Sequence, residues 1–277
     1  SIAGTTSYDP TEDHSLINSF ATAAYRFGHT LIQGLVNMAD VDDPDSIVRV
    51  YQLKQNFFNM DNYLHDNGLG MEQLMAGMIG QHAQRFDRFV TQDVTNFLFA
   101  AFGEDTGKNK KRTFGADLVS RNIQRGRDHG LPGYNKYRQL CSLRGLPPFK
   151  SNSHPSEISL ESWKMLSELY ETPDDIDLFV GGLAEFPLRG SVTGPTFNCI
   201  KSMMFKKVLN GDRFFFTHKN QAGSFSPKQL KQLRRRTLRD VICENTEVAK
   251  ARRSVFSLEG EMIDCGTVNS LDIYSFV

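Results

Sequence analysis

A histidine and an arginine three residues apart lie in an amphipathic stretch near the start of the chain. His29 falls on or beside an apolar stripe, where a charged imidazolium would be costly to bury and a neutral ring needs a polar partner. A neutral imidazole among apolar side chains is the chemistry of an axial ligand to haem iron. Arg26 would share a helix face with His29 and meet an anionic group beside the metal, and Gly28 would let a flat ligand approach the backbone. A lone histidine on an apolar face is more often a hydrogen-bonded core residue, so this stretch alone leaves both interpretations open.

The element expected to position His29 is one helix over residues 16–35. Apolar residues recur there at steps of three and four, which predicts a single apolar face. The residues that form this face are Leu16, Ile17, Phe20, Ala21, Ala24, Phe27, Gly28, Leu31, Ile32 and Leu35.

A second stretch, residues 118–135, has the sequence LVSRNIQRGRDHGLPGYN. We expect a helix that begins near Ala116 and ends at the turn of residues 130–133. Together with residues 26–30, this stretch strongly resembles the animal haem peroxidases of the peroxidase–cyclooxygenase superfamily, and among them invertebrate peroxidase-like or peroxinectin-like proteins. Further matches are TPDDID at residues 172–177, the glycine pair at 181 and 182, and GDRF at residues 211–214. The resemblance covers nearly the whole chain, and it implies that residues 1–277 are the C-terminal, proximal portion of a single haem peroxidase domain.

The resemblance implies a role for four residues. His29 matches the proximal iron ligand, and Asn122 matches the asparagine that accepts the Nδ1 proton of that histidine. Such an acceptor fixes the tautomer and the orientation of the ring. Arg26 and Arg125 match arginines near the haem propionates, where a forked guanidinium pairs well with a carboxylate.

Some neighbours of these residues have simpler interpretations. We interpret Arg127 and Asp128 as solvated or internally paired charges and His129 as a structural residue. Arg121 departs from the family pattern, because many members carry an apolar residue such as leucine there. A cation at this position either extends away from the site or perturbs the proximal pocket.

The distal half of a family active site has no counterpart in this sequence. In the family the distal histidine, the distal arginine, the haem-linking carboxylates and the calcium loop all precede the proximal helix. Only 28 residues precede His29, and they contain no distal-type motif. We therefore expect no catalytic distal residue and no family calcium site in this chain. A companion chain that carries the distal half, or sequence outside these 277 residues, would have to supply the acid–base pair that splits peroxide.

Composition excludes two classes of partner. The chain has 277 residues, 39% hydrophobic and 23% charged, and a formal net charge of zero, so charge gives no case for nucleic-acid binding. No run of 18 apolar residues is present, so no membrane-spanning segment is expected.

Four cysteines, Cys141, Cys199, Cys243 and Cys265, form an even set without CxxC spacing. This count allows two disulfides in any of three pairings, with four free thiols as the alternative. The family resemblance selects Cys141–Cys199 and Cys243–Cys265. Both pairs fit an oxidising, extracellular location.

Helical patterns dominate the rest of the chain. The longest covers residues 71–102, Ser159 is expected to cap a helix over residues 160–170, and Ser226 with Pro227 begins one over residues 228–243. The fold class is therefore predicted to be mainly α, of the animal haem peroxidase type, with few or no short strands. The last of these helices has a basic face that is either ordinary solvated surface or a contact for acidic matrix components; it consists of Lys228, Lys231, Arg234, Arg235, Arg236 and Arg239.

Two functions are compatible with the sequence. The first is the haem-binding portion of a secreted peroxidase that uses hydrogen peroxide to oxidise phenolic, tyrosyl or halide substrates, with iron held by His29. The second is a non-catalytic, peroxidase-like extracellular matrix protein that lacks the distal half and turns over no substrate.

Overall fold

The computed structural model describes residues 4–100, 115–268 and 270–276. Within them the ordered structure is mostly helical, and four short strands form two antiparallel two-stranded sheets. The prediction of a mainly α fold with few short strands is confirmed. The α-helices are α1 Asn18–Thr22, α2 Asp61–Leu64, α3 Gly70–Gly80, α4 Gln92–Thr95, α5 Leu118–Asp128, α6 Tyr134–Leu140, α7 Leu160–Leu169, α8 Leu178–Ala184, α9 Pro195–Gly211, α10 Pro227–Arg235 and α11 Leu238–Asn245. The 3₁₀ helices are η1 Ala24–Leu31, η2 Leu53–Gln55, η3 Asp66–Gly68, η4 Pro173–Asp175, η5 Cys265–Thr267 and η6 Ile273–Phe276, and the strands are β1 Leu35–Ala39, β2 Ile47–Gln52, β3 Lys250–Arg252 and β4 Met262–Asp264.

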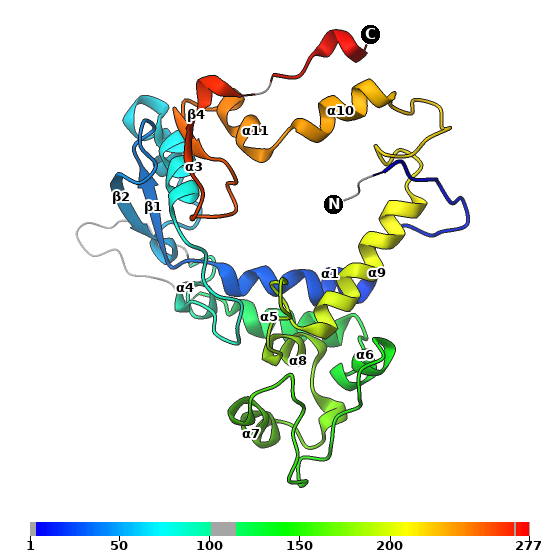
Figure 1. Cartoon of the computed structure of the whole chain (residues 1–277). Helices are drawn as coiled ribbons and strands as arrows, with labels where there is room; N and C mark the ends of the chain where they lie inside the picture. The colour runs from blue at the N-terminus through cyan, green and yellow to red at the C-terminus, as the bar shows by residue number, and fades with distance from the viewer. Residues whose placement is uncertain (1–3, 101–114, 269, 277) are drawn as a thin grey trace, which may run out of the picture.

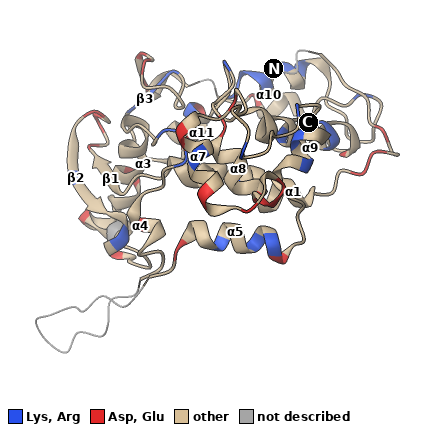
Figure 2. Ribbon diagram, turned by 90° about the horizontal axis from the view of Figure 1, so that it is seen from below, with Lys and Arg blue, Asp and Glu red and all other residues tan. Residues whose placement is uncertain are grey.

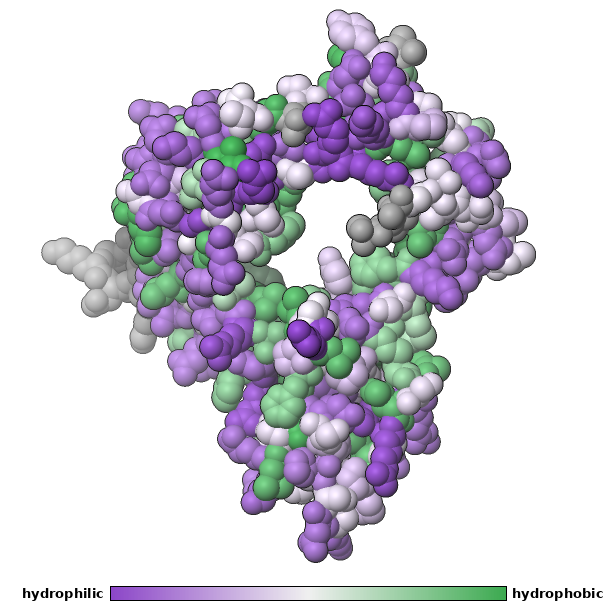
Figure 3. Space-filling model, viewed as in Figure 1, coloured by the Kyte–Doolittle hydropathy of each residue, from purple (hydrophilic) through white to green (hydrophobic). Residues whose placement is uncertain are grey.

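The elements form a ring around a central opening (Figure 1). Helices α1 and α9 border it below and to the right, α3 with the β1–β2 hairpin lies on the left, and α10 and α11 lie above it. The space-filling view shows that side chains leave the centre of the ring open (Figure 3). The main core lies below the opening, where α1, η1, α6, α7, α8 and α9 meet, and a smaller core lies under α3, α11 and β3.

The segment that carries His29 is a 3₁₀ helix, so the prediction of a single helix over residues 16–35 is wrong. The α-helix ends at Thr22, because Ala23 leaves the helical region (φ −133°, ψ −65°), and the chain continues as η1 and then β1. Both ends of the predicted apolar face are solvent-exposed, Leu16 at 66% and Leu35 at 53%. Tyrosine, phenylalanine, glycine and threonine in η1 favour the α-helix weakly, which lets tertiary contacts choose another conformation. Residues three apart eclipse in a 3₁₀ helix, so Arg26 and His29 lie on the same side of η1.

Two other predicted helices are interrupted. Between residues 71 and 100 the chain forms α3 and the short α4 with a non-helical segment between them, and residues 101 and 102 lie outside the described residues. Helix α3 ends at Gly80, where a Cβ atom would lie 2.3 Å from the carbonyl oxygen of Pro44. The helix expected over residues 228–243 divides into α10 and α11 at Thr237, which forms a capping box with Asp240.

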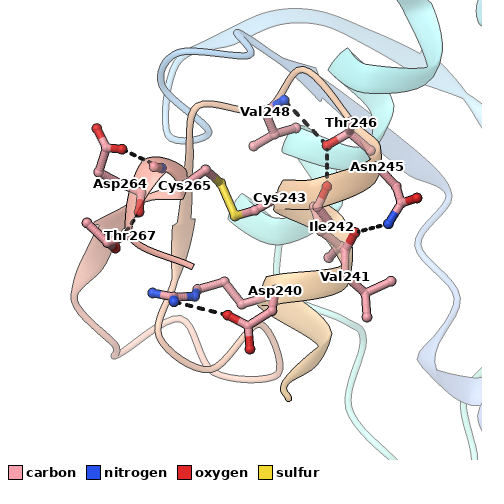
Figure 4. The surroundings of a disulfide bond; sticks show 12 residues. Asp240, Val241, Ile242, Cys243, Asn245, Thr246, Val248, Asp264, Cys265 and Thr267 are labelled. Carbon is pink, nitrogen blue, oxygen red and sulfur yellow. Dashed lines mark hydrogen bonds and ion pairs between the residues drawn. A yellow bond between two sulfur atoms is a disulfide. The ribbon is translucent and has the colours of Figure 1, made fainter. Parts of the chain in front are cut away.

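Other local predictions are confirmed. Ser159 caps α7 through the amide of Ser162, and Ser226 caps α10 through the amide of Gln229. Both disulfides have the pairing that the resemblance selects. Cys141 at the end of α6 bonds to Cys199 in α9, and Cys243 in α11 bonds to Cys265 in η5 (Figure 4).

Removal of Cys141–Cys199 is expected to destabilise the protein more than removal of Cys243–Cys265. The first bond closes a sequence separation of 58 residues and the second one of 22. If loop-closure entropy dominates, each disulfide contributes about 2–5 kcal/mol and the longer loop about 1 kcal/mol more. Chemical denaturation of the two Cys→Ser double variants measures this difference. Equal or reversed losses would show that contacts around the sulfurs matter more than chain entropy.

Candidate functional site

Three predicted site residues lie in contact. The Nδ1 atom of His29 lies 2.8 Å from Nδ2 of Asn122, and Arg26 donates from Nη1 to Oδ1 of Asn122 at 3.1 Å. Asn122 is fully buried on α5, whereas Arg26 and His29 are half-buried on the shared side of η1. One amide therefore bridges the two side chains that the sequence places three residues apart.

The helix that carries Asn122 is fixed at both ends. At its start, Oδ1 of Asp117 accepts from the amide of Val119 at 2.8 Å, which caps α5. At its end, Nδ1 of His129 lies 2.9 Å from Oδ1 of Asn18 and so connects α5 to α1. This contact supports the structural interpretation of His129.

The orientation of the Asn122 amide follows from Arg26. A guanidinium only donates hydrogen bonds, so Arg26 takes the amide oxygen and leaves the NH2 group for His29. Nδ1 of His29 then accepts a hydrogen bond, and its proton resides on Nε2. Iron ligation through Nε2 needs the tautomer with the proton on Nδ1. The Asn122 amide then has to rotate so that its oxygen faces Nδ1, and Arg26 has to give up its hydrogen bond to that oxygen.

The His29 ring is suited to remain neutral. Burial lowers the pKa of His29, and the positive charge of Arg26 lowers it further. A metal-ligating imidazole must be unprotonated on the bonding nitrogen, so this shift favours ligation. Among the described residues Nε2 has no hydrogen-bond partner, and a Cβ atom added at Gly28 would meet nothing within 4 Å. The space beside Gly28 and the unused nitrogen fit a flat ligand with a metal at its centre.

A cavity of about 560 Å³ adjoins this constellation. Its lining includes Arg26, Arg121, Asn122 and Arg125, together with apolar walls at Leu98 and Leu118. Arg125 is half-exposed and pairs with Asp128 at 2.7 Å. The structure thus brings the two predicted propionate-binding arginines to one cavity, and burial together with the neighbouring Arg125 lowers the pKa of Arg26.

The charged residues that follow Arg125 form ion pairs within the chain, in agreement with their interpretation as solvated or internally paired charges. Arg127 makes a two-pronged contact with Asp177, at 3.0 Å from Nε and 2.7 Å from Nη2. The hydroxyl of Tyr170 donates to the same carboxylate at 2.8 Å. Arg127 therefore connects α5 to the start of α8, whereas Asp128 is paired within α5.

A buried polar network near this core gave no signal in the sequence. Glu185 and Arg138 are almost fully buried, and the Glu185 carboxylate accepts from Tyr134 at 2.6 Å and from the hydroxyl of Thr196 at 2.6 Å. Arg138 reaches Glu185 at 3.5 Å and Glu157 at 3.1 Å. Burial raises the pKa of Glu185, and the hydrogen bonds from Thr196 and Tyr134 oppose that shift. These partners lie 11 to 51 residues from Glu185, so no local pattern marks them.

Among the residues that the structure describes, no three His, Cys, Asp or Glu side chains form a group that could hold a metal ion. A haem iron takes a single protein ligand on its proximal side, so this finding does not bear on His29. None of the helices in the described ranges is long and apolar enough to cross a membrane.

The known proteins with similar sequences are peroxidases or peroxidase-like proteins. The animal haem peroxidase family matches residues 1–256. Thyroid peroxidase from Sus scrofa is 32% identical over 271 residues, which are 96% of this chain and 28% of that protein. Peroxidase-like protein 3 from Lottia gigantea is 29% identical over 96% of this chain and 81% of that protein. The chain therefore spans about a quarter of the length of the thyroid peroxidase that it matches.

Structural similarity agrees with the sequences. Peroxidase A from Dictyostelium discoideum superposes with a TM-score of 0.72 at 30% identity, over 92% of this chain and 45% of that one. The matched residues include both α5 and the segment that carries His29. The chain belongs to the animal haem peroxidase family.

Proposed function

We propose that residues 1–277 form the proximal portion of a single peroxidase domain, in which His29 ligates haem iron. The observation that carries this proposal is the buried Asn122 amide between His29 and Arg26, with the second ring nitrogen of His29 facing no partner in the described chain. That nitrogen is left available for a ligand, as iron ligation requires. Family membership supports the cofactor assignment.

Each side chain has a defined task in this proposal. Haem, when bound, supplies the electron exchange between hydrogen peroxide and a phenolic, tyrosyl or halide substrate. Arg26 and Arg125 donate hydrogen bonds to the propionate carboxylates. Once Arg26 is engaged in this way, the Asn122 amide is free to turn and accept the Nδ1 proton of His29. That hydrogen bond holds the ring in the ligating tautomer and increases its basicity.

The acid–base pair for peroxide is assigned to a companion chain or to further sequence. The chain spans less than half of Peroxidase A, and the two portions together would make one active site. We also propose a secreted location, because two disulfides persist only under oxidising conditions.

An absorption spectrum tests the proposal. Protein from its native source, and recombinant protein titrated with haemin, are expected to show a Soret band with one haem per chain. Circular dichroism of the same samples reports whether the chain is folded. A folded protein that shows no Soret band with either source of haem would overturn the proposal.

Asn122 variants test the orienting role. Asn122→Ala is expected to weaken haemin binding about 10- to 100-fold, the usual effect of losing such a partner to a metal-bound histidine. Asn122→Asp should retain haem and lower the Fe(III)/Fe(II) potential, because a carboxylate accepts the Nδ1 proton of His29 more strongly than an amide oxygen does and makes the ligand more basic. Haemin titration and potentiometry measure the two effects.

Asn245→Ala is the matched control, since this exposed amide bonds only to the carbonyl of Val241 among the described residues (Figure 4). Unchanged affinity in Asn122→Ala would contradict the orienting role and leave iron ligation by His29 to be judged by its own variants.

A second candidate is the non-catalytic matrix protein. Its support is the match to peroxidase-like protein 3 over 81% of that protein, because the name of this relative states likeness to a peroxidase and no activity. The basic face of α10 and α11 supports it less, because several of its arginines are engaged within the chain. Arg236 pairs with Glu244, Arg239 with Asp240, and Arg234 donates to the carbonyl of Gly4 at 2.7 Å. A featureless spectrum from folded native protein would favour this candidate.

A further inference from the structure

Three guanidinium groups share the cavity beside Asn122. Arg121 and Arg125 are four residues apart on α5, hence on one face of that helix, and Arg26 reaches the same cavity from η1. The arginines on α5 are seen in Figure 2, where the helix lies along one edge of the molecule. Like charges at this spacing repel and destabilise a helix. Helix stability therefore gives no reason for Arg121 to lie beside Arg125.

The carboxylates of the cavity are already engaged. Both oxygens of Asp117 serve the start of α5, one with the amide of Val119 and the other with the hydroxyl of Ser120. Asp128 pairs with Arg125. Three arginines against two aspartates leave the lining with a net charge of +1 (3 − 2). The backbone amide of Arg121 donates to the carbonyl of Asp117, whereas its guanidinium forms no hydrogen bond or ion pair with any residue in the described ranges.

The walls of the cavity are apolar. Leu98 and Leu118 line it together with Phe99, and the buried Asn122 connects it to His29. Excess positive charge beside apolar and aromatic surface is complementary to a flat apolar ligand that carries carboxylates at its edge.

We propose that Arg121 is a third carboxylate-binding residue of this cavity and makes the chain selective for a dicarboxylate macrocycle over its esterified form. This inference rests on the proposed haem function and specifies how the ligand edge is recognised. Arg121 donates to a carboxylate directly, while Arg26 changes its acceptor from Asn122 to a second carboxylate. The added charge contributes affinity that falls as ionic strength rises.

Metal-free protoporphyrin IX is the appropriate probe, because it has no iron for His29 to bind. Its dissociation constant, and that of its dimethyl ester, are measured by porphyrin fluorescence with the protein and with the Arg121→Leu variant. Arg121→Leu is expected to weaken binding of the diacid about threefold to fivefold, as for an exposed charge pair, and to leave the diester unchanged. Arg121→Lys should recover most of the loss, and the salt dependence of diacid binding should decrease in Arg121→Leu.

Arg189→Leu is the matched control, since Arg189 is exposed and lies outside the cavity. The inference would be overturned if the unaltered protein and Arg121→Leu bound the diacid equally well, or if Arg121→Leu lost as much affinity for the diester as for the diacid. Neither result would contradict haem binding. A protein that binds neither haemin nor protoporphyrin IX would overturn the haem proposal together with this inference. Circular dichroism of Arg121→Leu confirms that any loss comes from binding and not from unfolding.

Discussion

His29→Gly protein is expected to lose the Soret band that haemin gives with the unaltered chain, and added imidazole is expected to restore it. Glycine removes the only predicted iron ligand and opens space beside Gly28, where the structure already has room. Free imidazole can occupy that space and bind iron in place of the side chain. The band of the histidine-ligated haem should be absent at haemin concentrations that saturate the unaltered protein, because apolar contacts and propionate binding can retain the porphyrin but supply no axial nitrogen to the iron.

The control for this result is His154→Gly, which removes an exposed histidine that lies outside the Asn122 cavity. It should leave the spectrum unchanged. A full Soret band in His29→Gly without imidazole would contradict ligation by His29. A band that imidazole restores in His29→Gly but not in the double variant with Asn122→Ala would show that Asn122 orients the ligand.

Glu185→Leu is expected to give the largest loss of stability of any single change proposed for this chain. The side chain of Glu185 is fully buried. Removal of its charge leaves Arg138, whose side chain is 2% exposed, with the half-buried Glu157 as its one ionic partner among the described residues. Tyr134 and Thr196 lose their acceptor at the same time. Breaking a buried ion pair from one side costs about 3–5 kcal/mol, so the free energy of unfolding should fall by that amount.

Urea denaturation followed by circular dichroism measures the loss. The free energy of unfolding of Glu185→Gln should lie between those of the unaltered protein and Glu185→Leu. Glutamine keeps an acceptor oxygen for Tyr134 but loses the charge opposite Arg138. Glu161→Leu is the control, since that carboxylate is 74% exposed and its pair with Arg88 contributes less than about 1 kcal/mol. A Glu185→Leu protein as stable as the Glu161→Leu control would show that the burial cost of the charges equals their mutual attraction.

Local sequence determined several features of this protein. Serine followed by a helical pattern fixed the starts of α7 and α10, because a side-chain oxygen satisfies free amides of the first turn. The amphipathic stretch of the family signature became α5 close to its expected limits. Motifs around His29 and Asn122 were also enough to indicate the family, which the match over residues 1–256 confirms.

Only the tertiary structure decided how those residues meet. His29 and Asn122 are 93 positions apart, and Arg26 competes for the same amide across a similar separation. The 3₁₀ form of η1 depends on its packing against α8 and α9, since its own residues prefer no conformation strongly. Arg121 entered the Asn122 cavity and Glu185 joined the Arg138 network for the same reason. Periodicity and capping report contacts within a few residues, whereas the free energy that fixes a buried polar group comes from partners that the folded chain brings together.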